Sequence, residues 1–241
     1  MVHKAGGRSN RKEKRDKIPF YSHIPYSSQV GFQAEGAKEG SCQHCIYGRK
    51  EQFQKKATKI LVNNHIQQEE EGFTVVSLDE SFFFHDSLVR RVWIDKGKRP
   101  VVRVTGSHKH SCVFGAISIE GKQLFRQYQI FNGDTFLEFL KTIHGKFPKC
   151  HLFMDKASPH YRSRRVIEYF EENKNTLIPV YLPTASPEFM VMEEVWNMAK
   201  RDLLVLKHYP SFADFKKRIS GYFRTKRFNL DVRNYLLRNV F

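Results

Sequence analysis

The sequence predicts an α/β fold, a mixed sheet with helices on both faces, and three observations lead to that prediction. Short runs rich in β-branched and aromatic residues begin at Phe73, as is typical of buried strands. The first three runs follow one another without a helical period between them, which favours antiparallel pairing. The later runs alternate with helical periods, which supply the crossovers that parallel strands need. The predicted order of elements is βββαβαβα.

The three antiparallel strands come first along the chain. The first is "FTVVSLDESFFF" at 73–84, and "RRVWID" at 90–95 adds a short extended piece. "SCVFGAISI" at 111–119 and "QLFRQYQIF" at 123–131 form the next two strands, and Gly121 supplies the turn between them.

The first helix of the domain is predicted at 133–147. Asp134 is the expected cap, and Gly145 is expected to mark the helix end. After Pro148 the periodicity indicates a strand, a helix, a strand and a helix, at 150–155, 162–173, 176–182 and 188–206.

The two ends of the chain differ from this middle part. Residues 1–72 have a charged start and a Gly/Ser/Tyr/Gln-rich middle, and they predict an irregular basic segment with one amphipathic helix at 51–71. We expect this segment to be a truncated DNA-binding region. Residues 73–241 form the second predicted domain, which ends in a basic helical tail from Lys207.

The charge balance indicates a polyanionic partner. The 241 residues include 41 Lys and Arg against 25 Asp and Glu, a formal net charge of +16, which favours nucleic acid. No apolar stretch approaches the roughly 18 residues of a membrane span, and no leader is apparent, so we expect a cytoplasmic protein. The four cysteines do not suggest a disulfide framework, and Cys112 and Cys150 are predicted core residues.

Three carboxylates stand at positions suited to a metal site. Asp79 is assigned to the end of the first strand, Asp155 to the end of the fourth, and Glu193 to the start of the last helix. Ligands collect at strand ends in α/β sheets, and Asp79 and Asp155 lie side by side if their strands are neighbours. Clustered carboxylates repel unless a cation neutralises them. Two Mg²⁺ or Mn²⁺ ions about 3.5–4 Å apart would suit phosphodiester chemistry.

Helix phase favours Glu193 over its neighbour as the third carboxylate. The apolar stripe of the helix comprises Met192, Val195, Trp196, Ala199 and Leu203. Glu193 lies at the edge of that stripe, whereas Glu194 is turned by about a further 100° and groups with Arg201. Glu194 remains the competing assignment. Glu80 points to the other side of its strand from Asp79 and is interpreted as structural.

Three local stretches resemble the motifs of DDE-superfamily transposases of the mariner-like and prokaryotic insertion-sequence kind. They are "LDES" at 78–81, "MDKASPH" at 154–160 and "LPTASPEFMVMEEVW" at 182–196. The resemblance covers roughly residues 73–240 and implies a ribonuclease H-like catalytic domain. Such proteins use Mg²⁺ or Mn²⁺ to cleave and transfer DNA strands, which implies double-stranded transposon ends and target DNA as partners, and a homodimer when ends are synapsed.

Carried over by position, the resemblance makes Asp79 and Asp155 the first and second catalytic carboxylates. Glu193 is the third, because its spacing to Trp196 matches the family's Glu-x-x-Trp. His160 occupies the family's histidine position, where it would orient a phosphate or a metal-bound water, or simply be a core-edge histidine.

The chain departs from the family pattern at two places. Lys156 stands where the family has Asn, and Met190 and Val191 stand where it has Asn-Pro. Two hypotheses therefore compete: an active, prokaryotic, nucleoid-associated transposase, and an inactive remnant that binds DNA without sequence preference. Another ribonuclease H-like nuclease, such as a resolvase, is a third interpretation.

Residues 1–72 lack a convincing pair of helix-turn-helix helices, which full-length members of the resembled family place ahead of the catalytic domain. Cys42 and Cys45 have the spacing of half a zinc knuckle, with His23 or His44 as further ligands. No second cysteine pair follows, so a polar loop is the favoured interpretation.

Overall fold

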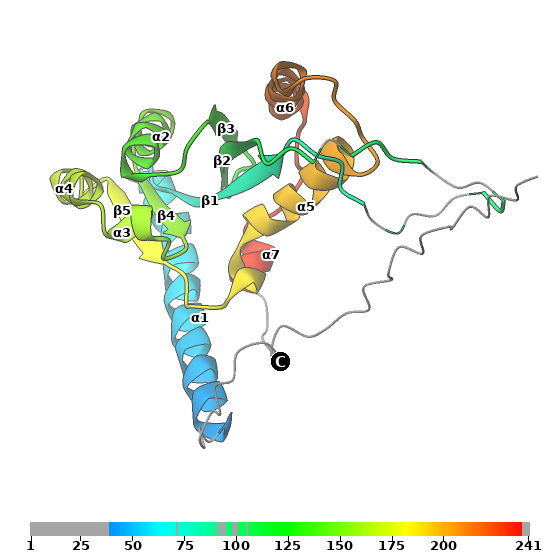
Figure 1. The fold of residues 1–241 in the computed structure, drawn as a ribbon. Coiled ribbons are helices and arrows are strands. Elements are labelled where there is room, and N and C mark those ends of the chain that lie inside the picture. Colours follow the sequence, from blue (N-terminus) through cyan, green and yellow to red (C-terminus); the bar gives the residue numbers. More distant parts are fainter. Residues whose placement is uncertain are drawn as a thin grey trace, which may run out of the picture. The chain divides into compact units, whose positions relative to one another are not determined.

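The computed structural model describes residues 39–70, 72–89, 91, 95–97, 101–104 and 106–237, and for 39–45 and 64–70 only the backbone. The chain divides into two units, Met1–Glu39 and Gly40–Phe241, and the second contains the sheet. Its sheet has five strands, drawn in Figure 1: β1 (Thr74–Phe84), β2 (His110–Ser118), β3 (Gln123–Tyr128), β4 (Cys150–Met154) and β5 (Leu177–Tyr181).

The strands lie in the order β3-β2-β1-β4-β5. The pairs β1–β2 and β2–β3 are antiparallel, whereas β1–β4 and β4–β5 are parallel. The parallel pairs are reached through α2 (Gly133–Lys146), and through α3 (Ser158–Tyr161) with α4 (Arg164–Glu172). The predicted βββαβαβα order is confirmed, with α3 as one additional turn of helix.

Helices cover both faces of this sheet, as predicted. Alternate residues of β1 enter two separate cores, because successive side chains point to opposite faces. Val76 and Leu78 pack in the core beneath α2 and α4, whereas Val75 and Phe83 pack in the core beneath α5 (Val191–Leu204) and α6 (Phe212–Thr225). Side chains in the middle of β1 therefore enter both cores, in alternation along the strand.

The helix predicted at 51–71 begins earlier, since α1 spans Glu39–Glu70. Cys42 and Cys45 consequently fall on a helix, so the predicted loop is wrong, and their side chains lie outside the described residues. Tyr47 to Arg49 of this added part are exposed, so they contribute no apolar period that predicts a helix. Phe53 anchors the helix by packing on Phe153 and Phe189.

The two ends of α2 each correct one detail of the sequence prediction. Asn132, not Asp134, is the N-cap: its Oδ1 accepts from the backbone N–H groups of Asp134 and Thr135 at 3.1 and 2.9 Å. The Thr135 hydroxyl accepts in turn from the Asn132 N–H, which completes a capping box. Gly145 lies inside the last turn, and the helix ends at Lys146.

The remaining predictions are confirmed within a few residues. The last predicted helix starts as a short 3-10 turn at Pro187–Phe189 and continues as α5. The basic tail contains α6 and α7 (Arg233–Leu236). Most of the extended piece at 90–95 lies outside the described residues. Among the helices that are described, none has the length and apolar character to cross a membrane.

Candidate metal-binding active site

The pairing of β1 with β4 brings the first two carboxylates together. Ser77 is level with Phe153 in this parallel pair, so two residues further on Asp79 is level with Asp155. The placement of Asp79 at the end of its strand was wrong, because β1 continues to Phe84. Asp79 lies at an edge for a different reason: β4 stops at Met154 and leaves that side of β1 without a neighbouring strand.

A single cavity of about 290 Å³ joins the predicted site residues. Asp79, Asp155 and Glu193 all line it, and so does Lys156, whereas Glu194 does not. The rest of its wall is the segment from Leu182 to Pro187 with Ala157 and Met190. Glu193 and Lys156 are exposed to solvent at this cavity. The three carboxylates thus face one common space from three different elements.

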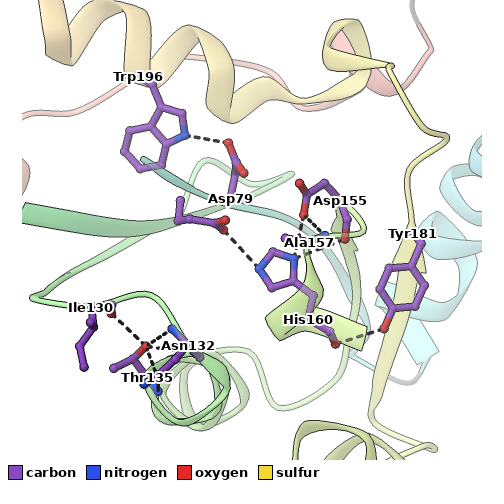
Figure 2. Close-up of polar contacts among 10 residues, drawn as sticks. Asp79, Ile130, Asn132, Thr135, Asp155, Ala157, His160, Tyr181 and Trp196 are labelled. Atoms are coloured by element: carbon purple, nitrogen blue, oxygen red, sulfur yellow. Dashed lines mark hydrogen bonds and ion pairs between the residues drawn. The ribbon is translucent and has the colours of Figure 1, made fainter. Parts of the chain in front are cut away.

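Asp79 is held on one side by α5. The indole Nε1 of Trp196 donates a hydrogen bond to Asp79 Oδ2 at 2.9 Å, as Figure 2 shows. Burial, followed by the charge of Glu80, raises the pKa of Asp79 to about 8, although the bond from Trp196 acts in the opposite direction. In the metal-free protein this carboxyl therefore keeps its proton at neutral pH.

A glycine behind Asp79 allows the indole to approach. Gly115 of β2 is the antiparallel partner of Asp79. A Cβ atom at Gly115 would lie 2.5 Å from Met192 Cε, 2.7 Å from Phe125 Cε1 and 2.8 Å from Trp196 Cη2. A side chain there would have to displace these groups. An isolated glycine within a strand indicates such a close approach, so the sequence carried a signal that was not used.

Asp155 is oriented by a histidine, and Figure 2 shows the contact. His160 Nδ1 lies 2.8 Å from Asp155 Oδ1, and the Ala157 N–H donates to the same oxygen at 2.9 Å. Burial alone would raise the pKa of Asp155, but the bonds from His160 and Ala157 hold it below its ordinary value. His160 is fully buried and its ring packs on Phe136 at 4.3 Å between centroids. The histidine therefore acts on Asp155 from behind and does not line the cavity.

Glu80 completes this polar chain on the opposite face of β1 from Asp79. Its Oε2 lies 3.2 Å from His160 Nε2, an ion-pair contact whose direction does not meet hydrogen-bond geometry. Burial lowers the pKa of His160, but Asp155 and Glu80 outweigh that effect and raise it to about 9. The imidazole is thus a cation between two carboxylates. Sequence reasoning missed the pairing, because α3 brings His160 to Glu80 only in the folded chain.

The helix that carries Glu193 starts without the family's Asn-Pro. Met190 is its N-cap and provides no side-chain hydrogen bond to the first turn. Its sulfur instead accepts from the Ser77 hydroxyl at 3.3 Å, and Val191 is fully buried. Packing therefore fixes the start of α5, and Glu193 occupies the first turn, where the helix dipole favours a negative charge.

The donor set suits Mg²⁺ or Mn²⁺, which prefer carboxylate oxygens. In the described part of the chain, no three His, Cys, Asp or Glu side chains are close enough together to hold an ion already. One oxygen of Asp79 is engaged by Trp196 and one of Asp155 by His160, so each carboxylate keeps its second oxygen. Asp79, Asp155 and Glu193 fit an ion once their side chains converge on the shared cavity.

A family model described as DDE superfamily endonuclease matches residues 74–216. The match spans more than half of the chain and includes Asp79, Asp155 and Glu193. The chain therefore belongs to the DDE superfamily endonucleases. A search of curated proteins gave no significant match.

Solved structures of the Mos1 transposase share the fold. The strand transfer complex is 15% identical with a TM-score of 0.53, over 79% of this chain and 57% of the Mos1 chain. The paired-end complex with the left transposon end is 16% identical with a TM-score of 0.52, over 93% and 62%. The paired end complex with Mg is 15% identical with a TM-score of 0.53, over 92% and 62%. The chain thus spans about three fifths of each Mos1 chain, and the predicted ribonuclease H-like fold is confirmed.

Proposed function

We propose that this protein is a DNA transposase that catalyses metal-dependent cleavage and strand transfer of an insertion sequence. The observation that carries the proposal is the single cavity lined by Asp79, Asp155 and Glu193 in a chain of the DDE endonuclease family. The structurally similar Mos1 complexes, described as paired-end and strand transfer complexes, support transposon-end and target DNA as partners and a homodimer that pairs the ends.

The three carboxylates are proposed to hold two Mg²⁺ or Mn²⁺ ions, and Mos1 complexes with Mg and with Mn support that choice. When bound, such ions supply Lewis-acid stabilisation to the attacking and leaving oxygens of a phosphodiester. Asp79 must lose its proton to become a ligand, because its pKa is raised to about 8. His160 and Glu80 act as positioning residues that fix the orientation of Asp155.

Lys156 gives the cavity a positive charge even when no metal ion is bound. Its side chain is exposed where the cavity opens. An ammonium group there would pair with a phosphate oxygen of DNA beside the cleaved bond. The same ammonium group would compete electrostatically with a divalent ion, so Lys156 directly affects whether this protein is catalytically active.

Nicking of supercoiled plasmid in Mn²⁺ or Mg²⁺ tests the proposal. Asp155→Asn should abolish nicking, because a neutral amide is a poor ligand for a hard cation. Asp134→Asn is the matched control, since Asp134 is exposed and pairs with Arg165 at the surface. Equal nicking by wild type and Asp155→Asn would reject the assignment. Release and joining of the element's own ends would then test strand transfer.

A second candidate is a protein that binds DNA non-specifically without metal turnover, and Lys156 in the cavity is the observation that favours it. The test is Lys156→Asn, which installs the residue of the family pattern. If the wild type does not nick DNA and Lys156→Asn does, the inactive remnant is the correct description. If the wild type nicks DNA, this candidate is excluded.

A further inference from the structure

A basic groove of about 1100 Å³ lies along the edge of the sheet, away from the carboxylates. Its walls are β3, part of β2, the C-terminal end of α2 and one side of α6, and Figure 1 shows β3 between these two helices. Six of its lining residues are cationic: Arg126, Lys146, Lys216, Lys217, Arg224 and Arg227. No Asp or Glu is among the described residues that line it.

The positive charges of this groove have no counterions within the described part of the protein. None of the six cationic side chains takes part in an ion pair there. The pKa of Lys146 is lowered, first by burial and then by the charges of Arg126, Arg227 and Lys122. Like charges held together in a concavity repel one another, and an anion from outside relieves that repulsion.

The groove also offers neutral hydrogen-bonding groups. Gln127, Gln129, Thr142 and Ser220 line it beside the cations. β3 is the outermost strand, so no further strand covers its free edge. Phosphate contacts in protein–DNA complexes are made by such amide and hydroxyl groups together with Lys and Arg.

We propose that this groove binds the sugar–phosphate backbone of duplex DNA, at a site distinct from the one where the strand is cut. The inference rests on the proposed function for the choice of DNA over another polyanion. The groove and the carboxylate cavity have no lining residue in common. The DNA held in the groove is therefore a stretch outside the cleaved phosphate.

A cluster of aromatic rings lies between the two sites and contacts residues of both. Phe125 and Phe223 line the groove, with ring centroids 4.7 Å apart. Both pack on Trp196, at 6.2 and 5.9 Å, and Trp196 donates to Asp79. DNA seated in the groove would thus lie against Phe125 and Phe223, which pack on the indole that donates to Asp79.

The test is fluorescence anisotropy of the full chain with a labelled random-sequence duplex in EDTA, which separates binding from cleavage. The groove variant is Arg126→Gln, Lys146→Gln and Arg227→Gln, three exposed side chains. The control variant is Lys59→Gln, Arg164→Gln and Lys174→Gln, which removes the same charge from exposed positions outside the groove.

The groove variant should bind at least about tenfold more weakly than the control variant, and its log K against log salt slope should fall by roughly 2 to 3 over about 50–200 mM salt. Equal affinities and slopes for the two variants would overturn the proposal. Tighter binding of polyglutamate or single-stranded RNA than of duplex DNA to the wild type, lost in the groove variant, would also overturn it.

Nicking in Mn²⁺ at saturating DNA separates this inference from the proposed function. The control variant should retain wild-type nicking there, because its three positions lie outside both the carboxylate cavity and the groove. If the wild type fails to nick DNA, and the groove variant but not the control variant binds DNA more weakly than the wild type, the enzymatic function is rejected and the groove assignment stands.

Discussion

Trp196 Nε1 and Asp79 Oδ2 lie 2.9 Å apart, and this bond joins helix α5 to the central strand of the sheet. Glu193 is on the same helix, three residues before Trp196. The bond therefore sets the position of two carboxylates at once: it holds Asp79 directly and fixes the rotation of the helix that presents Glu193. The site's geometry depends on this contact between layers.

Trp196→Phe should remove that bond and keep most of the packing on Phe125 and Phe223. We expect a loss of about 1 kcal/mol in the free energy of unfolding. Because the indole bond lowers the pKa of Asp79, the variant's metal affinity should also require a higher pH. Urea unfolding with Mn²⁺ titration at several pH values measures both effects. An unchanged pH profile would show that the bond does not act on the carboxyl.

Metal binding to the protein should release a proton from Asp79. The carboxyl is protonated below its raised pKa of about 8, so an ion must displace the proton there. The Mn²⁺ affinity should rise by up to about tenfold per pH unit below 8 and level off above it. Calorimetry of Mn²⁺ binding in buffers of different ionisation enthalpy counts the proton. Binding heats independent of the buffer would contradict the predicted release.

Gly115→Ala should destabilise the fold, because the new methyl group would overlap side chains of α5 and Phe125. Overpacking of this kind costs about 1–3 kcal/mol. Gly145→Ala is the matched control: it lies in α2 with nothing within 4 Å of the new atom, and alanine there should stabilise by about 0.5–1 kcal/mol. Chemical denaturation compares the two. Equal stabilities for both variants would refute the close approach at Gly115.

Glu80→Gln should weaken the buried pair with His160 in the metal-free protein. The pKa of His160 is raised to about 9, so the pair's stabilisation is complete below about 6.5 and is lost as the pH rises through 9. The variant should melt at a lower temperature than wild type at pH 6, and the difference should shrink towards pH 10. Glu168→Gln on the exposed face of α4 is the control. A difference independent of pH would mean that His160 is not charged.

The sequence identified the strands of Asp79 and Asp155 through their periodicity and local motifs, but that these strands are neighbours is shown by the pairing of β1 with β4 in the structure. It did not reveal the ion pair of Glu80 with His160. Strand alternation placed Glu80 correctly on the opposite face, but its partner arrives from α3, a contact that no local pattern encodes. The sequence also did not reveal the extra length of α1, where Tyr47 to Arg49 are exposed and carry no apolar period.

The N-cap of α2 is a further feature that the sequence alone does not determine. Asn132 and Asp134 are both favourable cap residues, and composition alone does not choose between them. In the structure Asn132 is the cap, because its Oδ1 accepts from the N–H groups of Asp134 and Thr135 while the Thr135 hydroxyl accepts from the Asn132 N–H. The choice depends on reciprocal hydrogen bonds rather than on residue preference.

Anomalous X-ray diffraction from crystals of the protein soaked in Mn²⁺ tests the central claim most directly. We expect anomalous peaks in the cavity, with oxygen ligands from Asp79, Asp155 and Glu193 at about 2.0–2.2 Å. Asp155→Asn crystals soaked in the same way should lose them. Mn²⁺ bound elsewhere on the chain, with this cavity empty while Lys156 pairs with the carboxylates, would contradict the claim.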